Sequence, residues 1–389
     1  MSDELPKWIS DVLYIFSLKT AVDRLQLTAW SDRVGERAME KCLKPVLIGL
    51  VGAGVNTRQK HIPALMAIDG VEIVSVVNRR RDSSQMVAER FGIPNVYDSW
   101  EKLVNASDSN AIVIGTWPNL HCPVTLAALA AGKHVLTEAR MAMDAAEAES
   151  MRSAAQQHPE LVTQVVPSPL TLHLDRTVQR LLAEGYLGRL LTVEVRTLNG
   201  MHSDPKAPMH WRQNIRLSGV NVMSLGIWYE SIMRWVGEAR SVFAMGRISA
   251  KSRYDPLIGA ESTVCIPDYL VASARMECGA QAIFIQSSVS KNITANEAVL
   301  SGTEGTLRIA DGELFGAING DEEFTRIPVP QEEAGRWRVE EEFIGAIRGD
   351  EEVKLTTFDD GVKYMEFTEA VALSRKCESV VTVPPPLDL

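Results

Sequence analysis

The stretch VLIGLVGAG, residues 46–54, decides the fold of this chain. Its apolar run is too short for a typical helix and ends at glycines, where the backbone can bend sharply, and residues 61–66 then follow with helical periodicity. Strand, glycine turn and helix in this order bind the pyrophosphate of a dinucleotide, because residues without Cβ let the backbone approach and the helix N-terminus offers N–H groups. Where the usual fingerprint has its third glycine this chain has a threonine, so the motif alone also fits an ordinary strand-to-helix turn. On the first interpretation, the cofactor contacts Gly52, Gly54, Val55, Asn56, Thr57 and Arg58.

The end of the next predicted strand, residues 71–77, indicates the type of dinucleotide. It is followed by Asn78 and then by Arg79, Arg80 and Arg81. An acid at this position normally holds the ribose hydroxyls of NAD, whereas an amide and a cationic cluster suit the 2′-phosphate of NADP. The alternative is a solvated basic turn before a helix over residues 82–91. We expect Asn78, Arg79 and Arg80 to bind NADP, with NAD as the alternative cofactor.

The alternation of strands and helices continues to about residue 167 and then stops. Further strands are predicted at residues 111–115 and 133–137, with helices between them, which is typical of a doubly wound parallel sheet. Beyond residue 168, most strand candidates, one of them at residues 261–267, follow one another without helices and imply a mostly antiparallel sheet. The predicted fold is α/β, a Rossmann domain plus a C-terminal α+β domain with a large open sheet. The domains are a helical extension (1–44), the Rossmann domain (45–167) and a substrate and oligomerisation domain (168–389).

The first 44 residues carry an apolar stripe at helical spacing that includes Trp8, Val12 and Phe16. The polar face is mixed rather than basic, so we expect this segment to pack on its own domain or on a neighbouring subunit rather than on a membrane.

Composition excludes several classes of partner. The 389 residues carry a net charge of −10, whereas nucleic acid and anionic membranes both require a basic face. Five cysteines are scattered without paired spacing, which favours a reducing cytoplasm over disulfides or zinc. No apolar run reaches membrane length and the N-terminus begins acidic, so we expect a cytoplasmic protein. His202, Asp204 and His210 could serve as metal ligands, but their spacing fits neither one helix face nor a common zinc pattern, so we expect no metal site.

Several separated motifs resemble one family. They are GTWPNLH (115–121), AGKHVLTE (131–138), EGYLG (184–188), HWR (210–212) and SGTEG (301–305). In this order they are similar to motifs of the glucose–fructose oxidoreductase, inositol dehydrogenase and rhizopine-catabolism (Gfo/Idh/MocA) family. The resemblance implies a nicotinamide cofactor between a Rossmann domain and a sheet domain, a small-molecule substrate and a homo-oligomer, either a dimer or a tetramer. It also implies cofactor contacts at Thr116, Trp117, Pro118, Asn119, His121, Glu138 and Ala139.

The chain departs from the family at its catalytic positions. Ala139 stands where the family has a lysine, and alignment of the glycine near residue 219 places Ser224 and Trp228 where the family has Asp and His. Oxidation of a hydroxyl group needs a base within hydrogen-bond reach of the departing proton. The family's usual mechanism therefore cannot be carried over.

Two other residues are candidates for the missing chemistry. Arg140 can bind a carboxylate or a phosphate, or can merely neutralise Glu138. Tyr229 can deliver a proton if a nearby cation lowers its pKa, although a tyrosine packed in the interior with its hydroxyl group bonded is the more common case. The predicted catalytic pair is Tyr229 and Arg140, and the predicted substrate-binding residues are Arg140, Trp211, Arg212, Ser224, Trp228 and Tyr229; each tryptophan fits the core equally well.

Three classes of function fit these observations. The first is an NAD(P)-dependent oxidoreductase that acts on a sugar-like or other small carbonyl or hydroxyl compound with an altered acid/base set. The second is a lyase or glycosidase with a tightly bound nicotinamide, and the third is a non-catalytic dinucleotide-binding protein. The first is favoured on fold analogy.

Overall fold

The structure, a computed structural model, describes residues 45–386, so the predicted N-terminal extension lies outside the described residues. Six parallel strands form the first sheet, in the order β3–β2–β1–β4–β5–β6. The chain order reverses between β1 and β4, and sheets of this type bind dinucleotides at the carboxyl ends of the strands beside such a reversal. The predicted Rossmann topology is confirmed. The strands are β1 (Val46–Val51), β2 (Val71–Val77), β3 (Asn95–Val96), β4 (Ala111–Ile114), β5 (His134–Thr137) and β6 (Thr163–Val165).

Helices pack on both faces of this sheet and bury two separate apolar clusters. Ile48 and Leu50 of β1 belong to one cluster with Ile62 and Leu65. Val51 and Ile112 belong to the other, with residues of the helices around positions 100–130. Strands buried on both faces explain the nearly continuous apolar runs in the sequence. The helices are η1 (Thr57–His61), α2 (Ile62–Met66), α3 (Arg81–Phe91), α4 (Trp100–Asn105), η2 (Pro118–Leu120), α5 (His121–Ala130) and α6 (Ala145–Gln157).

A second sheet has nine strands in the order β16–β15–β14–β13–β7–β12–β11–β8–β17. Its strand pairs are antiparallel except for β12 and β7, which run parallel, so the predicted mostly antiparallel sheet is confirmed. The strands are β7 (Leu190–Leu198), β8 (Ala239–Arg247), β11 (Tyr269–Met276), β12 (Gln281–Ser287), β13 (Ala295–Gly302), β14 (Gly305–Ala310), β15 (Glu313–Ile318), β16 (Thr325–Arg326) and β17 (Val381–Thr382).

The strand predicted at residues 261–267 is wrong in extent and position. Its first part forms β10 (Ala260–Thr263), which pairs with β9 (Ser252–Asp255) in a separate two-stranded sheet. Turn residues on both sides isolate this hairpin from the large sheet, and periodicity alone gives no information on which strands pair.

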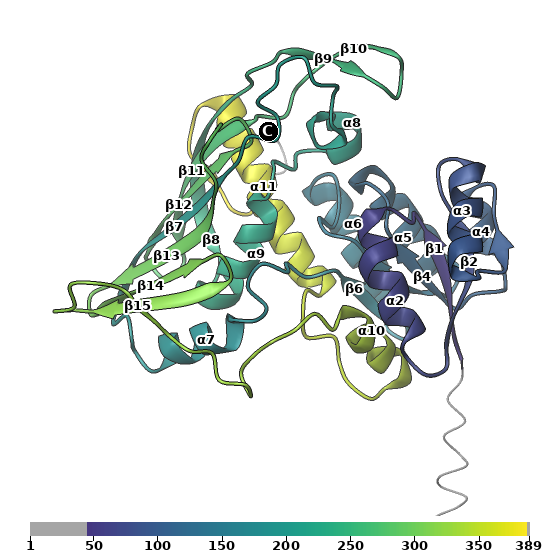
Figure 1. The fold of residues 1–389 in the computed structure, drawn as a ribbon, viewed down its shortest axis with the longest axis horizontal. Helices are drawn as coiled ribbons and strands as arrows, with labels where there is room; N and C mark the ends of the chain where they lie inside the picture. The colour runs from purple at the N-terminus through teal and green to yellow at the C-terminus, as the bar shows by residue number, and fades with distance from the viewer. Residues whose placement is uncertain (1–44, 387–389) are drawn as a thin grey trace, which may run out of the picture. The chain divides into compact units, whose positions relative to one another are not determined.

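Three helices lie beside the large sheet, α7 (Asp175–Ala183), α9 (Leu225–Val236) and α11 (Phe358–Cys377). Figure 1 shows them on the side of the sheet that faces the parallel sheet. The alternation of buried and more exposed residues in β11 and β12 follows from this one-sided cover. Among residues 45–386, no helix combines the length and apolar character needed to cross a bilayer.

Helix α10 (Val339–Arg348) returns to the Rossmann part from far along the chain. Val339, Phe343 and Ile344 share a buried cluster with Ile62 and Leu65 of α2. The predicted domain boundary at residues 167/168 remains a prediction. In space, however, a segment from the C-terminal half completes the core around the glycine turn.

Candidate functional site

The glycine turn after β1 has two residues with different physical roles. Gly52 has φ +88°, and a Cβ there would lie 2.7 Å from Thr116 Cγ2 and 2.8 Å from the backbone of Gly115. Its N–H donates to the carbonyl of Val77 at 2.8 Å. Gly54 is exposed, and its nearest neighbour would lie 3.7 Å from a Cβ. Gly52 therefore permits the turn itself, and Gly54 leaves its backbone open to a ligand.

Thr57 closes the turn instead of a third glycine. It is buried, and its Oγ1 donates to the Gly52 carbonyl at 3.2 Å. Arg58 donates from Nε to the Gly54 carbonyl at 3.2 Å. Val55 and Asn56 are exposed at the start of the helix that follows. Of the residues predicted to contact phosphates, Gly54, Val55 and Asn56 are thus accessible. Thr57 is buried and stabilises the turn through its bond to Gly52.

Asn78 supports the same turn from the end of β2. Its Oδ1 accepts the Ala53 N–H at 2.7 Å, and its Nδ2 donates to the Ser83 carbonyl and Oγ, each at 3.1 Å. The amide is therefore engaged in holding the turn to β2. No acidic side chain stands at this strand end to pair with a ribose.

The arginines after Asn78 differ in their partners. Arg81 pairs with Asp98, whereas Arg79 and Arg80 make no ion pair with any described residue. The Arg79 guanidinium lies 5.4 Å from the ring centroid of Trp117, which follows β4. Two exposed and uncompensated cations therefore stand next to the glycine turn.

The segment after β4 is fixed by a buried histidine. His121 lies with Nδ1 2.9 Å from the carbonyl oxygen of Arg140 and Nε2 3.1 Å from that of Thr116. Burial lowers its pKa, although these carbonyls oppose the shift. His121 thus ties the turn after β4 to the turn after β5. Pro118 is buried within the same turn, and Asn119 Oδ1 is buried without a hydrogen-bond partner in the described structure.

Glu138, which follows β5, belongs to a chain of buried ionisable groups. Its Oε1 lies 3.0 Å from His61 Nε2 and accepts a hydrogen bond from Asn56 Nδ2. His61 Nδ1 lies 2.5 Å from Glu340 Oε1, and Trp337 Nε1 donates to Glu340 Oε2 at 2.9 Å. Burial alone would lower the pKa of His61, but the two carboxylates raise it to about 9. The pKa of Glu138 lies below its ordinary value, because the contact with His61 outweighs burial.

His61 and Glu340 lie beside the glycine turn and were not identified by the sequence prediction. The signal for His61 was weak: an ionisable residue at a position of the helix that otherwise carries apolar side chains. Glu340 lies 279 residues away in sequence, and nothing in the local pattern connects it with the glycine turn.

Arg140 is buried two residues after Glu138. Nη1 donates to the Met223 carbonyl at 3.1 Å, whereas Nε is buried and has no partner among the described residues. Burial and the charge of Arg212 lower the pKa of Arg140 to about 10. One alternative was that Arg140 merely neutralises Glu138. The described structure has no ion pair between these two residues.

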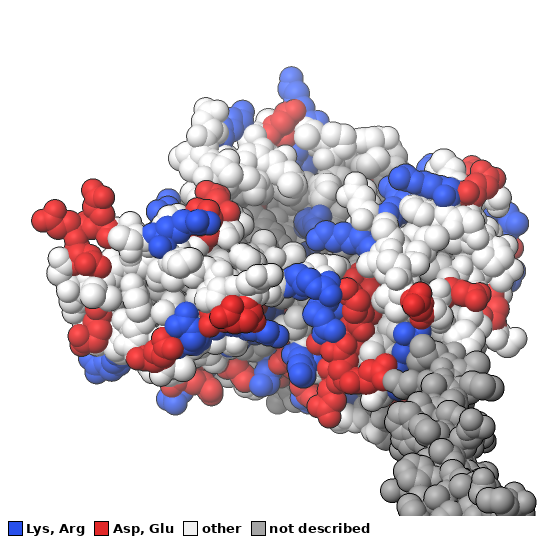
Figure 2. All heavy atoms as spheres, turned by 60° about the horizontal axis from the view of Figure 1, so that its bottom comes forward, with Lys and Arg blue, Asp and Glu red and all other residues white. Residues whose placement is uncertain are grey.

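Two tryptophans, one after β4 and one in the C-terminal half of the chain, stack on each other near Arg140 and Arg212. Trp117 and Trp211 stack with ring centroids 6.2 Å apart and an interplanar angle of 22°. Arg212 lies 4.1 Å above the Trp211 ring. Burial lowers the pKa of Arg212, and the charge of Glu138 opposes this shift. Trp211 and Arg212 therefore lie at the predicted cleft. Lys and Arg side chains also lie beside the hollow visible in Figure 2.

Trp228 and Tyr229 do not lie where the sequence prediction placed them. Trp228 is 1% exposed and donates from Nε1 to Asn296 Oδ1 at 3.0 Å. Tyr229 is fully buried, stacks on Phe367 with centroids 3.7 Å apart, and accepts the Ala239 N–H at 2.8 Å. Burial raises the pKa of the Tyr229 hydroxyl, the opposite of what proton delivery needs. The predicted catalytic Tyr229 and substrate-binding Trp228 are corrected to core residues.

Ser224 lies at the N-terminus of α9 and is partly exposed. Its Oγ donates to Gln286 Oε1 at 2.8 Å, on β12. It follows Met223, whose carbonyl accepts from Arg140. Ser224 and Arg140 therefore lie close together at the start of α9, and their shared role in substrate binding stays a prediction.

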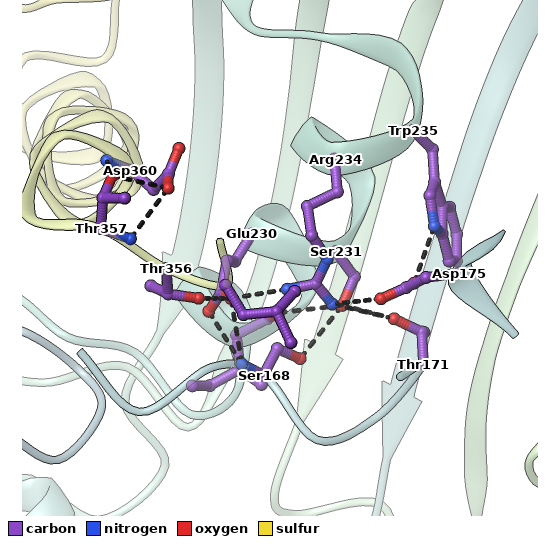
Figure 3. A network of polar contacts seen from close by, with 12 residues as sticks. Ser168, Thr171, Asp175, Glu230, Ser231, Arg234, Trp235, Thr356, Thr357 and Asp360 are labelled. Atoms are coloured by element: carbon purple, nitrogen blue, oxygen red, sulfur yellow. Dashed lines mark hydrogen bonds and ion pairs between the residues drawn. The ribbon is translucent and has the colours of Figure 1, made fainter. Parts of the chain in front are cut away.

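A buried polar network fixes the other half of α9 (Figure 3). Glu230 accepts from the Ser168 N–H at 3.0 Å, from Thr356 Oγ1 at 2.6 Å and from Arg234 Nη1 at 2.6 Å. Arg234 also pairs with Asp175 at 3.0 Å. Burial raises the pKa of Glu230, and its partners oppose the shift. The network holds α9 against the segment that links the two sheets and so positions its N-terminus in the site.

The cleft fits a nicotinamide dinucleotide. An open glycine backbone, a helix N-terminus, two unpaired arginines and an unpartnered amide oxygen at Asn119 line the carboxyl ends of β1, β2 and β4. No cluster of three or more His, Cys, Asp or Glu side chains within residues 45–386 is placed to hold a metal ion.

Comparisons with known proteins agree with this architecture. A family model described as "Oxidoreductase family, NAD-binding Rossmann fold" matches residues 46–165, and one described as "GFO/IDH/MocA C-terminal domain" matches residues 176–308. An uncharacterized oxidoreductase of Rhizobium meliloti is 27% identical over 56% of this chain, a match that spans 62% of its own length. Trans-1,2-dihydrobenzene-1,2-diol dehydrogenase of Mus musculus is 26% identical over 71% of this chain and 77% of that protein. The solved structure of levoglucosan dehydrogenase in complex with NADH and L-sorbose has a TM-score of 0.75 at 22% identity, covering 87% of this chain and 99% of that chain.

Proposed function

This chain belongs to the Gfo/Idh/MocA family of oxidoreductases, and from that premise we propose that it transfers a hydride between a nicotinamide cofactor and a small carbonyl or hydroxyl compound. The observation that carries the proposal is the open Gly54 backbone after β1, in a turn whose Asn56 donates a hydrogen bond to Glu138, two residues before Arg140. The dehydrogenases among its relatives support it.

We propose NADP(H) as the preferred cofactor. Arg79 and Arg80 are exposed without carboxylate partners, and the amide of Asn78 replaces the acid that a ribose hydroxyl would need. A guanidinium gains a charge-assisted hydrogen bond only with the 2′-phosphate. Calorimetric titration of wild type and Arg79→Ala tests this preference. The variant should lose affinity for NADPH alone, whereas equal losses for NADPH and NADH would contradict the proposal.

The residues of the cleft favour reduction over oxidation. A bound reduced nicotinamide supplies a hydride. Ala139 and Ser224 offer no base for removing a hydroxyl proton, and Tyr229 is buried in the core. The carboxylate of Glu138 is already bonded to His61 and Asn56. Hydride transfer to a carbonyl leaves negative charge on its oxygen, and the cations of the cleft favour negative charge. Water then protonates that oxygen, so no strong side-chain acid is required.

Turnover assays in both directions test the proposed reaction. The purified protein should consume NADPH with members of a panel of small aldehydes and ketones, and should reduce NADP⁺ far more slowly with the matching alcohols. Faster oxidation would overturn the proposed direction. Saturable cofactor binding without turnover in either direction would instead indicate a dinucleotide-binding protein, and nicotinamide absorbance that survives gel filtration would indicate a non-redox enzyme.

We also propose a cytoplasmic homo-oligomer in which a second copy covers the outer face of the large sheet. Phe243 and Met245 of β8 and Tyr269 of β11 are exposed large apolar residues of these neighbouring strands. Apolar surface of this kind marks protein interfaces. Light scattering should give a dimer or tetramer that Met245→Glu dissociates, and an unchanged mass for that variant would contradict the proposed interface.

A further inference from the structure

We propose that Arg140 and Arg212 form a subsite for a carboxylate group of the substrate, so that the enzyme acts on small carbonyl acids. This inference rests on the proposed function and adds the substrate class to it. It assigns to the two arginines a binding role that their structural contacts leave open.

The buried side chain of Arg140 is incompletely hydrogen-bonded. The residue is only 4% exposed. Its side chain nevertheless makes a single hydrogen bond to a described residue, from Nη1 to the Met223 carbonyl. Nε is buried and has no hydrogen-bond partner within residues 45–386. An unpaired buried charge is costly, and proteins keep one where a ligand completes it.

The ionisable groups beside Arg140 carry an excess of positive charge. Arg140, Arg212 and protonated His61 are three cations, and Glu138 and Glu340 are two anions. Both carboxylates contact His61, and neither makes an ion pair with the arginines in the described structure. Arg79 and Arg80 belong to the proposed 2′-phosphate site, so one positive charge remains beside Arg140. A single carboxylate neutralises it, whereas a doubly charged phosphate would overcompensate.

The N-terminus of α9 lies against Arg140. In the first turn of this helix, a Cβ on Gly226 would stand 3.6 Å from Arg140 Cδ. That turn carries no acidic side chain. The N–H groups of a first helical turn lack partners within the helix and favour an anion. The helix end and the two guanidinium groups thus attract the same kind of ligand.

The geometry of the two arginines also favours an oxyanion. A guanidinium presents its N–H groups in a flat fork that matches two oxygens of a carboxylate or of a phosphate, so the charge balance decides for the carboxylate. Ser224 Oγ is next to the carbonyl that holds Arg140 and is already bonded to Gln286. It can donate to one acceptor only, so the arginines remain the principal donors for the acid group.

Matched ligand pairs test the proposal. Calorimetry on full-length protein saturated with its nicotinamide cofactor compares D-glucuronate with D-glucose, D-gluconate with sorbitol, and glycolate with glycolamide, and adds D-glucose 6-phosphate as the phosphate probe. We expect at least one acid to bind roughly tenfold tighter than its neutral partner, since charge-assisted hydrogen bonds are among the strongest. Arg140→Met and Arg212→Met should remove this preference, Arg140→Lys should restore part of it, and the exposed control Arg216→Met should keep it.

The outcomes separate this inference from the proposed function. Failure to bind any nicotinamide would overturn the proposed function itself. Cofactor binding with equal affinities in all three pairs would overturn the carboxylate subsite alone, as would tighter binding of D-glucose 6-phosphate than of D-glucuronate. Folding is monitored through the melting temperature, which Arg140→Met should leave unchanged or raise because it removes a buried uncompensated charge. A lower melting temperature together with an unchanged acid preference would identify Arg140 as purely structural.

Discussion

Replacing His61 by glutamine should remove a pH-dependent part of the protein's stability. His61 is fully buried between Glu138 and Glu340, at 3.0 Å and 2.5 Å, and it joins the glycine turn, β5 and α10. Glutamine preserves much of the volume and can still donate hydrogen bonds from its amide nitrogen, but it carries no charge. The variant therefore tests the ion pair and leaves the packing largely in place.

The magnitude follows from the raised pKa of His61. A rise from 6.5 to about 9, at about 1.4 kcal/mol per unit, corresponds to about 3 kcal/mol. Because the folded-state pKa is the higher one, this contribution is complete below the unfolded value of 6.5 and is lost as the pH rises through about 9. With about 2.1 cal/mol/K of unfolding entropy per residue, 3 kcal/mol lowers the melting temperature of a unit this size by roughly 4 °C.

Differential scanning calorimetry from pH 6 to pH 10 measures this effect. Wild type should lose stability between neutral pH and pH 9, and the gap between wild type and His61→Gln should close over the same range. His158→Gln is the control, because His158 is partly exposed and meets Glu160 at the surface. Parallel pH profiles for wild type and His61→Gln would refute the assignment of a charged His61.

Three further variants test the site and its surroundings. Gly52→Ala should weaken dinucleotide binding at least roughly tenfold by calorimetry, because its Cβ would meet the backbone of Gly115, whereas Gly132→Ala has a similar positive φ but open space and should not. Trp228→Phe should lower the free energy of unfolding by about 1 kcal/mol through loss of the bond to Asn296, with unchanged cofactor affinity. Tyr229→Phe should retain turnover, since Tyr229 only accepts the Ala239 N–H in the core; a large loss of activity would restore it as a catalytic candidate.

The fold was predictable where local patterns dictate it. The apolar run of β1 and the glycines after it specify a parallel strand and a tight turn, and the alternation of strands and helices specifies the doubly wound sheet. Helix α6 was not predicted, because its alanine-rich sequence from Ala145 to Gln157 has few large apolar residues with which to show a period. The sequence also gave no sign that α10 returns to the glycine turn.

The site was predictable at strand ends and poorly predictable on α9. Asn56, Glu138 and Arg140 follow directly from their positions after buried strands. The direction in which Trp228 and Tyr229 point depends on the rotation of α9 about its axis. Contacts with Asn296 and Phe367 determine that rotation. Pairing of His61 with Glu340 depends on a contact across 279 residues. Tertiary packing, rather than local propensity, determines these positions.

Transfer of a labelled hydride tests the central claim most directly. Full-length protein is incubated with NADPH deuterated at the hydride-donating carbon and a carbonyl acid that it binds, and the product is analysed by mass spectrometry. The proposed reaction predicts one deuterium on the carbon of the new hydroxyl group, in wild type and in Tyr229→Phe alike. A product without deuterium, or an unchanged carbonyl compound with saturating cofactor bound, would contradict the assignment of this chain as a nicotinamide-dependent reductase.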